Sequence, residues 1–367
     1  MSSALSRTPG AHVGTGVRVF VREIGVHAVN VLITGGSGYI GRFCARELVA
    51  AGGRVVALDR RPAPPLGDAS ATVSLTGDVA DRPLVERLLR DHDIDVVLHL
   101  AAEKSVADSM TAPGPHLLAN VAGSLHLLEG MRAQGVRRLV FSSSAAVYGS
   151  PRRVPVDERA AIAPDNPYGA GKAMVEQALH WYAVAHGFDV VSLRYFNAAG
   201  AAADGSLGED ASAATNLVPR VMQALAGLDG PVPIYGTDYP TPDGTAIRDY
   251  VHVEDLARAH RAAVELVARE RGERVFNLGT GRGHSVRQVL AAAGRAAGRA
   301  VPCVEAPRRP GDPAAVWADA SSAERELGWR AERDLDDIVR TAWRWQVGAA
   351  VSAGPVRAAP ASAGPAR

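Results

Sequence analysis

The chain has 367 residues, of which 47% are hydrophobic, and its formal net charge is +1. A chain of this length can bury the core of one large domain or of two interleaved ones. The balance of 40 basic against 39 acidic residues gives no electrostatic footprint for nucleic acid or another polyanion. The two cysteines, Cys44 and Cys303, lie far apart in the sequence. This usage is typical of reduced thiols in a cytoplasmic protein and not of a disulfide framework.

The sequence carries no metal-binding or membrane signal. None of the 11 histidines falls in a metal-ligand spacing such as HExxH, so we expect no metal site. We expect His252, within "DYVHVEDLA", to pack in the interior or to cap a helix. No apolar run reaches the ~18 residues that a membrane-spanning helix needs. Arginines interrupt the apolar stretch near the amino terminus, which argues against a signal peptide.

The two ends of the chain differ from its middle. We expect residues 1–28 to be a disordered extension. Residues 347–367 are rich in Ala, Pro, Gly and Ser and have no apolar period, so we expect a disordered tail there. The folded part is therefore predicted to span residues 29–346.

Short apolar runs alternate with helical patterns along the first half of the folded part. Strands are predicted at residues 29–36, 54–59, 71–75, 95–102, 137–144 and 189–197. Helices are predicted at residues 39–53, 83–92 and 123–135, and from Tyr168 onward. Parallel strands covered on both faces have this pattern, since nearly every strand position is apolar. We predict an α/β fold with a Rossmann-type, doubly wound parallel sheet at residues 29–195.

The second half, residues 196–346, is richer in loops and proline. Isolated strands are predicted at residues 232–236 and 274–279, and helices at residues 254–268, 285–297 and 335–346. We predict that this half forms a smaller substrate-binding α/β cap, partly interleaved with the first half, on the carboxyl edge of the sheet.

A glycine-rich turn follows the first strand. "TGGSGYIG" places Gly35, Gly38 and Gly41 between that strand and its helix, where backbone N–H groups can reach a pyrophosphate. Asp59 ends the second strand and can accept the hydroxyls of an adenosine ribose, which favours NAD over NADP. Arg60 and Arg61 follow it and could bind a phosphate, so they weaken this preference. "GDVAD" would place Asp78 near the adenine.

A tyrosine and a lysine lie one helical turn apart just after the fifth strand. In "NPYGAGK", Tyr168 and Lys172 share a helix face at the sheet edge where a nicotinamide would end. A phenol has a pKa of about 10, and a nearby ammonium favours its phenolate. Tyr168 could therefore accept an alcohol proton. Ser144, at the end of "FSSS", could share the substrate hydroxyl, although Ser142 and Ser143 are equally polar.

Several stretches together resemble one family. "VLITGGSGYIG", "FSSSAAVYG", "YGAGK", "LRYFNAAG" and "IRDYVHVEDLA" resemble the extended short-chain dehydrogenase/reductase superfamily. "YGTDYPTPDGT" and "APRRPGDPAAVWADAS" are more closely similar to the UDP-glucose 4-epimerases. The resemblance covers residues 29–346. It implies an isomerase in which the hexose C4 gives its hydride to NAD, the 4-keto sugar turns over, and the hydride returns to the other face.

The resemblance also implies roles for individual residues. Ser144, Tyr168 and Lys172 would be the catalytic triad. The residues expected to bind NAD are Gly35, Gly38, Tyr39, Ile40, Gly41, Asp59, Asp78, Val79, Leu100, Ala101, Ala102, Lys104, Asn120, Ser144, Tyr168, Lys172 and Tyr195. The residues expected to bind the UDP-sugar are Lys104, Ser144, Tyr168, Asn197, Asn216, Leu217, Ile234, Tyr235, Arg248, Arg309, Asp312 and Val316. Of these, Asn197, Arg248 and Arg309 would contact the diphosphate, with Asp312 on the uridine ribose.

Two departures from the family pattern bear on the substrate and cofactor. The loop after Asp59 is shorter than is usual in the family, so adenine contacts there are not carried over. Val316 stands where well-known bacterial members have a tyrosine near the sugar C2 substituent. A smaller side chain would leave room for an N-acetyl group, so turnover of UDP-N-acetylglucosamine is an alternative, as is a UDP-pentose.

Other functions are alternatives to epimerisation. Related dehydratases and decarboxylases need an extra acid beside the serine, where this chain has Ala145 and Ala146. A plain dehydrogenase would exchange NAD at each turnover, whereas an epimerase should retain it. A non-catalytic dinucleotide sensor would not need Ser144, Tyr168 and Lys172. Family likeness further implies a homodimer through two long helices, one of them beginning near Tyr168.

Overall fold

The computed structural model describes residues 29–62, 71–210, 215–309 and 311–352. The predicted amino-terminal extension and most of the predicted tail lie outside the described residues. The final helix, α10 (Leu335–Ser352), continues past residue 346. The tail was therefore predicted to begin six residues too early, because an Ala-rich stretch is compatible with helix as well as with disorder.

Seven parallel strands form the central sheet, in the order β10-β6-β5-β4-β1-β2-β3. Their bounds are β1 Asn30–Thr34, β2 Arg54–Asp59, β3 Thr72–Thr76, β4 Val96–His99, β5 Arg138–Ser144, β6 Asp189–Tyr195 and β10 Glu273–Leu278. All six strands predicted in the first half are present. The strand order reverses between β1 and β4, and ligands of open α/β sheets bind at such a switch point, outside the carboxyl ends of the strands.

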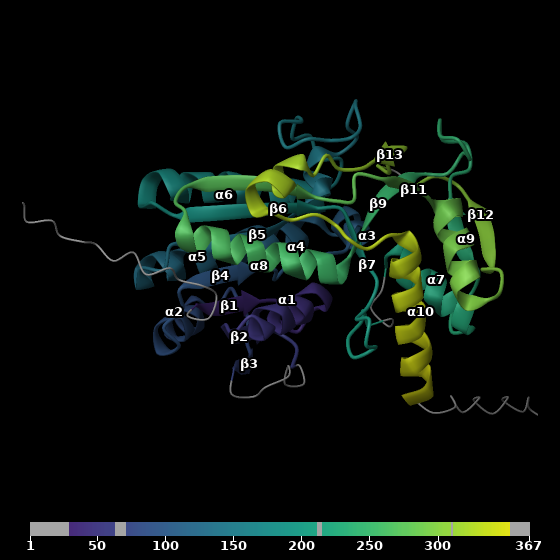
Figure 1. The fold of residues 1–367 in the computed structure, drawn as a ribbon. Helices are drawn as coiled ribbons and strands as arrows, with labels where there is room; N and C mark the ends of the chain where they lie inside the picture. The colour runs from purple at the N-terminus through teal and green to yellow at the C-terminus, as the bar shows by residue number, and fades with distance from the viewer. Residues whose placement is uncertain (1–28, 63–70, 211–214, 310, 353–367) are drawn as a thin grey trace, which may run out of the picture.

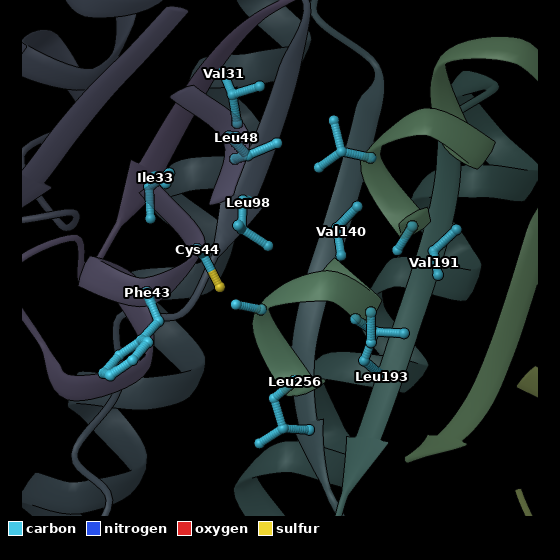
Figure 2. Packing of buried hydrophobic residues seen from close by; sticks show 14 of the residues in the cluster. Val31, Ile33, Phe43, Cys44, Leu48, Leu98, Val140, Val191, Leu193 and Leu256 are labelled. Atoms are coloured by element: carbon cyan, nitrogen blue, oxygen red, sulfur yellow. The ribbon is translucent and has the colours of Figure 1, made fainter. Parts of the chain in front are cut away.

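Helices cover both faces of this sheet (Figure 1). On one face lie α1 (Tyr39–Ala50) and α8 (Val253–Arg269), and on the other lie α2 (Arg82–Asp91), α5 (Gly123–Gln134) and α6 (Pro167–His186). Successive side chains of a strand point to opposite faces of the sheet, so alternate residues pack in the two hydrophobic cores. In β1, Val31 and Ile33 pack toward α1, and Leu32 packs on the opposite side. Figure 2 shows Val31 and Ile33 with Cys44 and Leu48 of α1.

The cap lies beside the carboxyl edge of the sheet. It contains a four-stranded sheet, in which β9 (Ile247–His252) pairs with β7 (Asn197–Ala199), β11 (Gly283–Ser285) and β13 (Ala315–Val316). A second, two-stranded sheet pairs β8 (Val232–Tyr235) with β12 (Cys303–Ala306). The helices α7 (Leu217–Ala226), α9 (Val286–Ala297) and α10 pack around a core of their own.

The two halves are interleaved. Strand β10 and helix α8 follow the cap strands β7, β8 and β9 in sequence, yet β10 is the edge strand beside β6 and α8 packs on the main sheet. The remaining short elements are α3 (Val106–Thr111), α4 (Pro113–Leu117), a π-helical turn at Leu118–Ala122, a 3₁₀ turn at Ala145–Tyr148 and a π-helical turn at Ala323–Leu327. The large sheet therefore depends on residues beyond 195.

Candidate active site

A large cleft follows the carboxyl edge of the sheet and continues under the cap. Its volume is about 1840 Å³. It is lined by every residue predicted to bind cofactor or substrate except two, Leu217 and Ile234. Ile234 is 2% exposed, and its side chain lies in the core of the cap, against which Leu217 also packs. A β-strand alternates its faces, so the neighbouring Tyr235 reaches the cleft while the side chain of Ile234 cannot.

The glycine turn is closed by contacts that leave no room for side chains. Gly35 has φ +75°, and a Cβ there would lie 2.8 Å from the amide nitrogen of Ala101. A Cβ on Gly41 would lie 2.3 Å from the carbonyl oxygen of Gly35. Helix α1 then begins after Gly38, which offers no side chain to cap its free N–H groups. A helix start that is open to a cleft fits the diphosphate of a dinucleotide.

Asp59 is fixed by the backbone at the end of β2. Its carboxylate accepts hydrogen bonds from the amides of Ser37 (3.1 Å) and Arg61 (3.0 Å). Arg60, beside it, forms an ion pair with Glu103, which follows β4. Glu103 was not predicted, because an isolated acid in a loop has no distinguishing pattern. This wall of the cleft thus presents a fixed carboxylate, as the ribose of a dinucleotide requires.

Helix α6 carries the tyrosine and the lysine into the cleft. Asn166 caps the helix by accepting a hydrogen bond from the amide of Gly169 (2.9 Å), and Pro167 opens its first turn. Lys172 is 4% exposed, and its Nζ donates to the carbonyl oxygen of Ser142 (2.7 Å). The same nitrogen lies 5.9 Å from the ring centroid of Tyr168. The predicted pair is therefore brought together in the interior of the site.

The three serines of β5 point in different directions. The hydroxyl of Ser142 bonds to His260, and that of Ser143 donates to Glu176 (2.5 Å). The Ser144 side chain lines the cleft, its hydroxyl accepts a hydrogen bond from the amide of Ala146 (3.1 Å), and its interaction with Tyr168 lowers the pKa of that phenol. Sequence proximity left these three serines equivalent, and the geometry distinguishes Ser144.

Burial perturbs the acid–base groups of the site. It raises the pKa of Tyr168, whereas the hydrogen bond with Ser144 lowers it. Burial lowers the pKa of Lys172 to about 8, and the nearby carboxylate of Glu176 opposes this shift. Burial also lowers the pKa of His99, on β4, to about 3, with a further contribution from Lys172. His99 is therefore neutral at physiological pH, and it bonds to Thr34 (2.7 Å) and Ser124 (2.8 Å).

Arginines from distant segments meet at the cap end of the cleft. The guanidinium of Arg248 lies 3.1 Å from a carboxylate oxygen of Asp312, and that of Arg309 lies 3.8 Å above the ring of Tyr235. Hydrogen bonding to Arg309, with a smaller contribution from Arg220, lowers the pKa of Tyr235. Guanidiniums bind phosphate oxygens in a bidentate manner, so this end of the cleft fits a diphosphate. Arg220 was not predicted.

The remaining predicted residues lie between these two ends. Lys104 forms an ion pair of 2.8 Å with the buried Glu209, which the sequence did not reveal. The amide of Asn120 holds the backbone of Glu103 through two hydrogen bonds (2.7 and 3.0 Å). Asn197 and Asn216 line the cleft with exposed side chains. Small or apolar side chains also line the cleft, among them Ala145, Ala146, Phe196 and Val316.

Two further expectations concern metals and membranes. His252 is fully buried, and its ring accepts a hydrogen bond from the amide of Glu254 (3.1 Å) at the start of α8. The prediction that it packs and caps a helix is confirmed. Within the ranges that the structure describes, there is no group of three or more His, Cys, Asp or Glu side chains that could hold a metal ion. No helix in these ranges is long and apolar enough to cross a membrane.

Comparison with known proteins agrees with this geometry. The model of the NAD dependent epimerase/dehydratase family matches residues 31–279. The chain belongs to this family. A UDP-glucose 4-epimerase of Azospirillum brasilense is 44% identical over 322 residues, which are 86% of this chain and 91% of the relative. A relative with the same name in Lactobacillus helveticus is 41% identical over 324 residues, 86% of this chain and 97% of its own.

Solved structures give the same assignment. The UDP-glucose 4-epimerase of Bifidobacterium longum, in complex with NAD⁺ and UDP, superposes with a TM-score of 0.84 at 40% identity, covering 87% of this chain and 98% of its own. The predicted resemblance to the UDP-glucose 4-epimerases is therefore confirmed.

We predict that Gly41→Ala removes NAD from the protein. The added methyl would lie 2.3 Å from backbone, so the turn must open, at a cost of about 1–3 kcal/mol. NAD released per chain on denaturation, together with the melting temperature, measures this effect. Gly123→Ala is the matched control on the same cleft, because its Cβ would meet Val79 at an ordinary 3.5 Å. Full NAD content in Gly41→Ala would contradict the assignment of the turn.

Proposed function

We propose that this chain is a UDP-glucose 4-epimerase, an NAD-dependent isomerase that interconverts UDP-glucose and UDP-galactose. The observation that carries the proposal is the setting of Tyr168. Ser144 lines the same cleft and lowers the pKa of its hydroxyl, Lys172 lies one turn away, and the cleft also contains the glycine turn and the arginines of the cap. In this proposal residues 29–195 hold NAD, and the substrate binds mainly to residues 196–346.

The chain's own residues would move and hold the proton. NAD supplies a reversible hydride acceptor when it is bound beside the sugar. Tyr168 takes the proton of the C4 hydroxyl and returns it later, while Ser144 shares the hydrogen bond to that oxygen. Burial alone favours the neutral phenol. The ammonium of Lys172 offsets this by favouring the phenolate, so Tyr168 can act near neutral pH.

The asymmetry of the cleft suits inversion at one carbon. Arg248 and Arg309 would hold the diphosphate by charge-assisted bonds. The lining of the cleft also includes Ala145, Phe196 and Val316, whose side chains carry no group that could hold a sugar hydroxyl. The nucleotide would thus stay bound while the hexose turns and presents its other face.

We predict that Tyr168→Phe lowers kcat for UDP-galactose by about 10²–10⁴-fold, the usual contribution of a positioned general base. The assay adds no NAD, because an epimerase retains its own. Tyr182→Phe is the control, since that hydroxyl lies on the same helix but bonds to Glu129 (2.6 Å), outside the cleft. A Tyr168→Phe enzyme within threefold of the wild type would favour the alternative function, a dinucleotide sensor.

The substrate range follows from Val316, and we infer that N-acetylated UDP-hexoses are also turned over. Val316 is 6% exposed, it packs against Val147, Tyr148 and Phe196, and it lines the cleft. A structure of a UDP-glucose 4-epimerase from Stenotrophomonas maltophila holds NAD and a formylated UDP-arabinopyranose, with a TM-score of 0.83 and 43% identity over 88% of this chain and 99% of its own. UDP-pentoses are therefore the other alternative substrates.

We predict that Val316→Tyr lowers turnover of UDP-N-acetylglucosamine at least 100-fold, because a ring would fill the space of the acetamido group. Turnover of UDP-galactose should change by less than tenfold, which corresponds to ~1.4 kcal/mol. NMR of the products, reading the C4 configuration, measures both. A wild-type enzyme with less than a thousandth of its UDP-galactose activity on UDP-N-acetylglucosamine would refute the wider range.

We also infer a homodimer formed through α5 and α6, which pack side by side. The apolar side chains that they expose include Leu125 (38%), Met174 (50%), Trp181 (60%) and Val184 (65%). Met174 and Trp181 lie two turns apart on one face of α6. A cytoplasmic location stays a prediction from the two cysteines, both of which are free.

We predict that Trp181→Glu converts a dimer into a monomer, because a charge would enter the centre of the apolar face. Size-exclusion chromatography with light scattering measures the mass. Val304→Glu, at another exposed apolar position, on the cap (51%), is the control and should leave the mass unchanged. A Trp181→Glu protein that is still dimeric would place the interface elsewhere.

A further inference from the structure

Glu176 lies one helical turn beyond Lys172 on α6. Tyr168, Lys172 and Glu176 are therefore spaced by four residues and share one face of the helix. That face packs on the end of β5, where the carbonyl oxygen of Ser142 accepts from Lys172 and the hydroxyl of Ser143 donates to Glu176. The carboxylate thus belongs to the row of side chains that reaches the active site, although it does not line the cleft.

A buried arginine fixes the carboxylate of Glu176. Arg194 of β6 donates from Nε to one carboxylate oxygen (2.9 Å) and from Nη2 to the other (2.6 Å). The side chains of the two residues are only 7% and 12% exposed. Ser143 adds a third hydrogen bond to the carboxylate (2.5 Å). This bidentate pair has one geometry, so Glu176 has a fixed position relative to Lys172.

The other side of Arg194 is also satisfied. Its Nη1 donates to the hydroxyl of Tyr148 (2.9 Å) and to the carbonyl oxygen of Glu158 (3.3 Å). The Tyr148 hydroxyl donates in turn to Asn277 on β10 (2.7 Å). Burial raises the pKa of Tyr148 to about 12, so it remains neutral. No other carboxylate in the described chain forms an ion pair with Arg194.

Few charged groups face the ammonium of Lys172. From its own helix it faces Tyr168 and Glu176, and from β4 it faces His99, which is neutral because its pKa is lowered to about 3. From β5 it meets the ring of Phe141 at 4.8 Å and the carbonyl oxygen of Ser142. Within the described residues, Glu176 is the carboxylate that raises the pKa of Lys172 against the effect of burial.

We propose that Glu176 is a positioning residue that keeps Lys172 charged, and that Arg194 limits its effect. The ammonium is buried beside an apolar ring, and desolvation favours its neutral form. A free carboxylate one turn away would stabilise the ammonium strongly, and a carboxylate paired with Arg194 does so less. How far Arg194 neutralises Glu176 therefore sets the pH above which Lys172 loses its proton. The inference rests on the proposed role of Lys172 beside Tyr168.

The chain offers a direct measurement, because it contains only two lysines, Lys104 and Lys172. Lysine labelled with ¹³C at Cε gives two NMR signals, and Lys104→Arg assigns them. The titration is followed in the NAD-loaded protein as purified. It reports the charge of Lys172 without reference to turnover, so it can fail while the proposed epimerase activity stands.

Opposite shifts are expected from the two halves of the pair. Glu176→Gln should lower the titration midpoint of Lys172 by at least one pH unit, because the supporting charge is lost and Arg194 is left unpaired. Arg194→Gln should raise the midpoint, because Glu176 is no longer neutralised. The double variant should lie within about half a unit of the wild type. The midpoint of Lys104, which pairs with Glu209, should be unchanged throughout.

The pH dependence of kcat should change in the same direction as the titration midpoint of Lys172. In Glu176→Gln the alkaline limb of the kcat profile should move to lower pH, giving a loss of about tenfold at pH 8.5 and little at pH 6.5. The KM for UDP-galactose should be unchanged, because the arginines of the cap are remote from the pair. The double variant should regain most of the loss at pH 8.5.

A purely structural role predicts different results. The two single variants would then lose kcat equally at all pH values, Lys172 would titrate as in the wild type, and the double variant would be the least active. Any of these outcomes overturns the proposal. If Glu176→Gln does not fold, a midpoint in Arg194→Gln that is unchanged or lowered would overturn it alone.

Discussion

Most of the active site depends on one buried cation. The ammonium of Lys172 is 4% exposed and lies between an aromatic ring and a backbone carbonyl. An isolated ammonium in such surroundings is strongly destabilised, so its neighbours must supply hydrogen bonds and negative charge. The carbonyl of Ser142 gives the first and Glu176 the second. The register of α6 on β5 is therefore fixed by the same contacts that make the site chemically competent.

Much of the fold and part of the site could be predicted from the sequence. Buried parallel strands are nearly continuous apolar runs, which made β1, β2, β4, β5 and β6 predictable, whereas β3 is a largely exposed edge strand. The cap strands β7, β11 and β13 are only two or three residues long, and β9, "IRDYVH", mixes charged with apolar residues, so no period reveals them. Ser144 and its two neighbours are identical in type, and only their partners in the folded chain, His260 for Ser142 and Glu176 for Ser143, separate their roles. Glu103 and Glu209 are isolated charges whose ion-pair partners lie far away in sequence.

The interleaving of the two halves has a consequence for catalysis. Strand β10 returns to the main sheet between two cap strands, after β9 and before β11, and it brings Asn277 beside Tyr148. Asn277 also donates to the carbonyl oxygen of Val156. The Tyr148 hydroxyl, which donates to Asn277, accepts a hydrogen bond from Arg194. Asn277 is therefore linked to Glu176 through Tyr148 and Arg194, and Glu176 in turn stabilises the ammonium of Lys172. A boundary drawn at residue 195 would separate the catalytic helix from part of its support. The two halves are therefore one unit for the chemistry of the site, even though the cap has its own core.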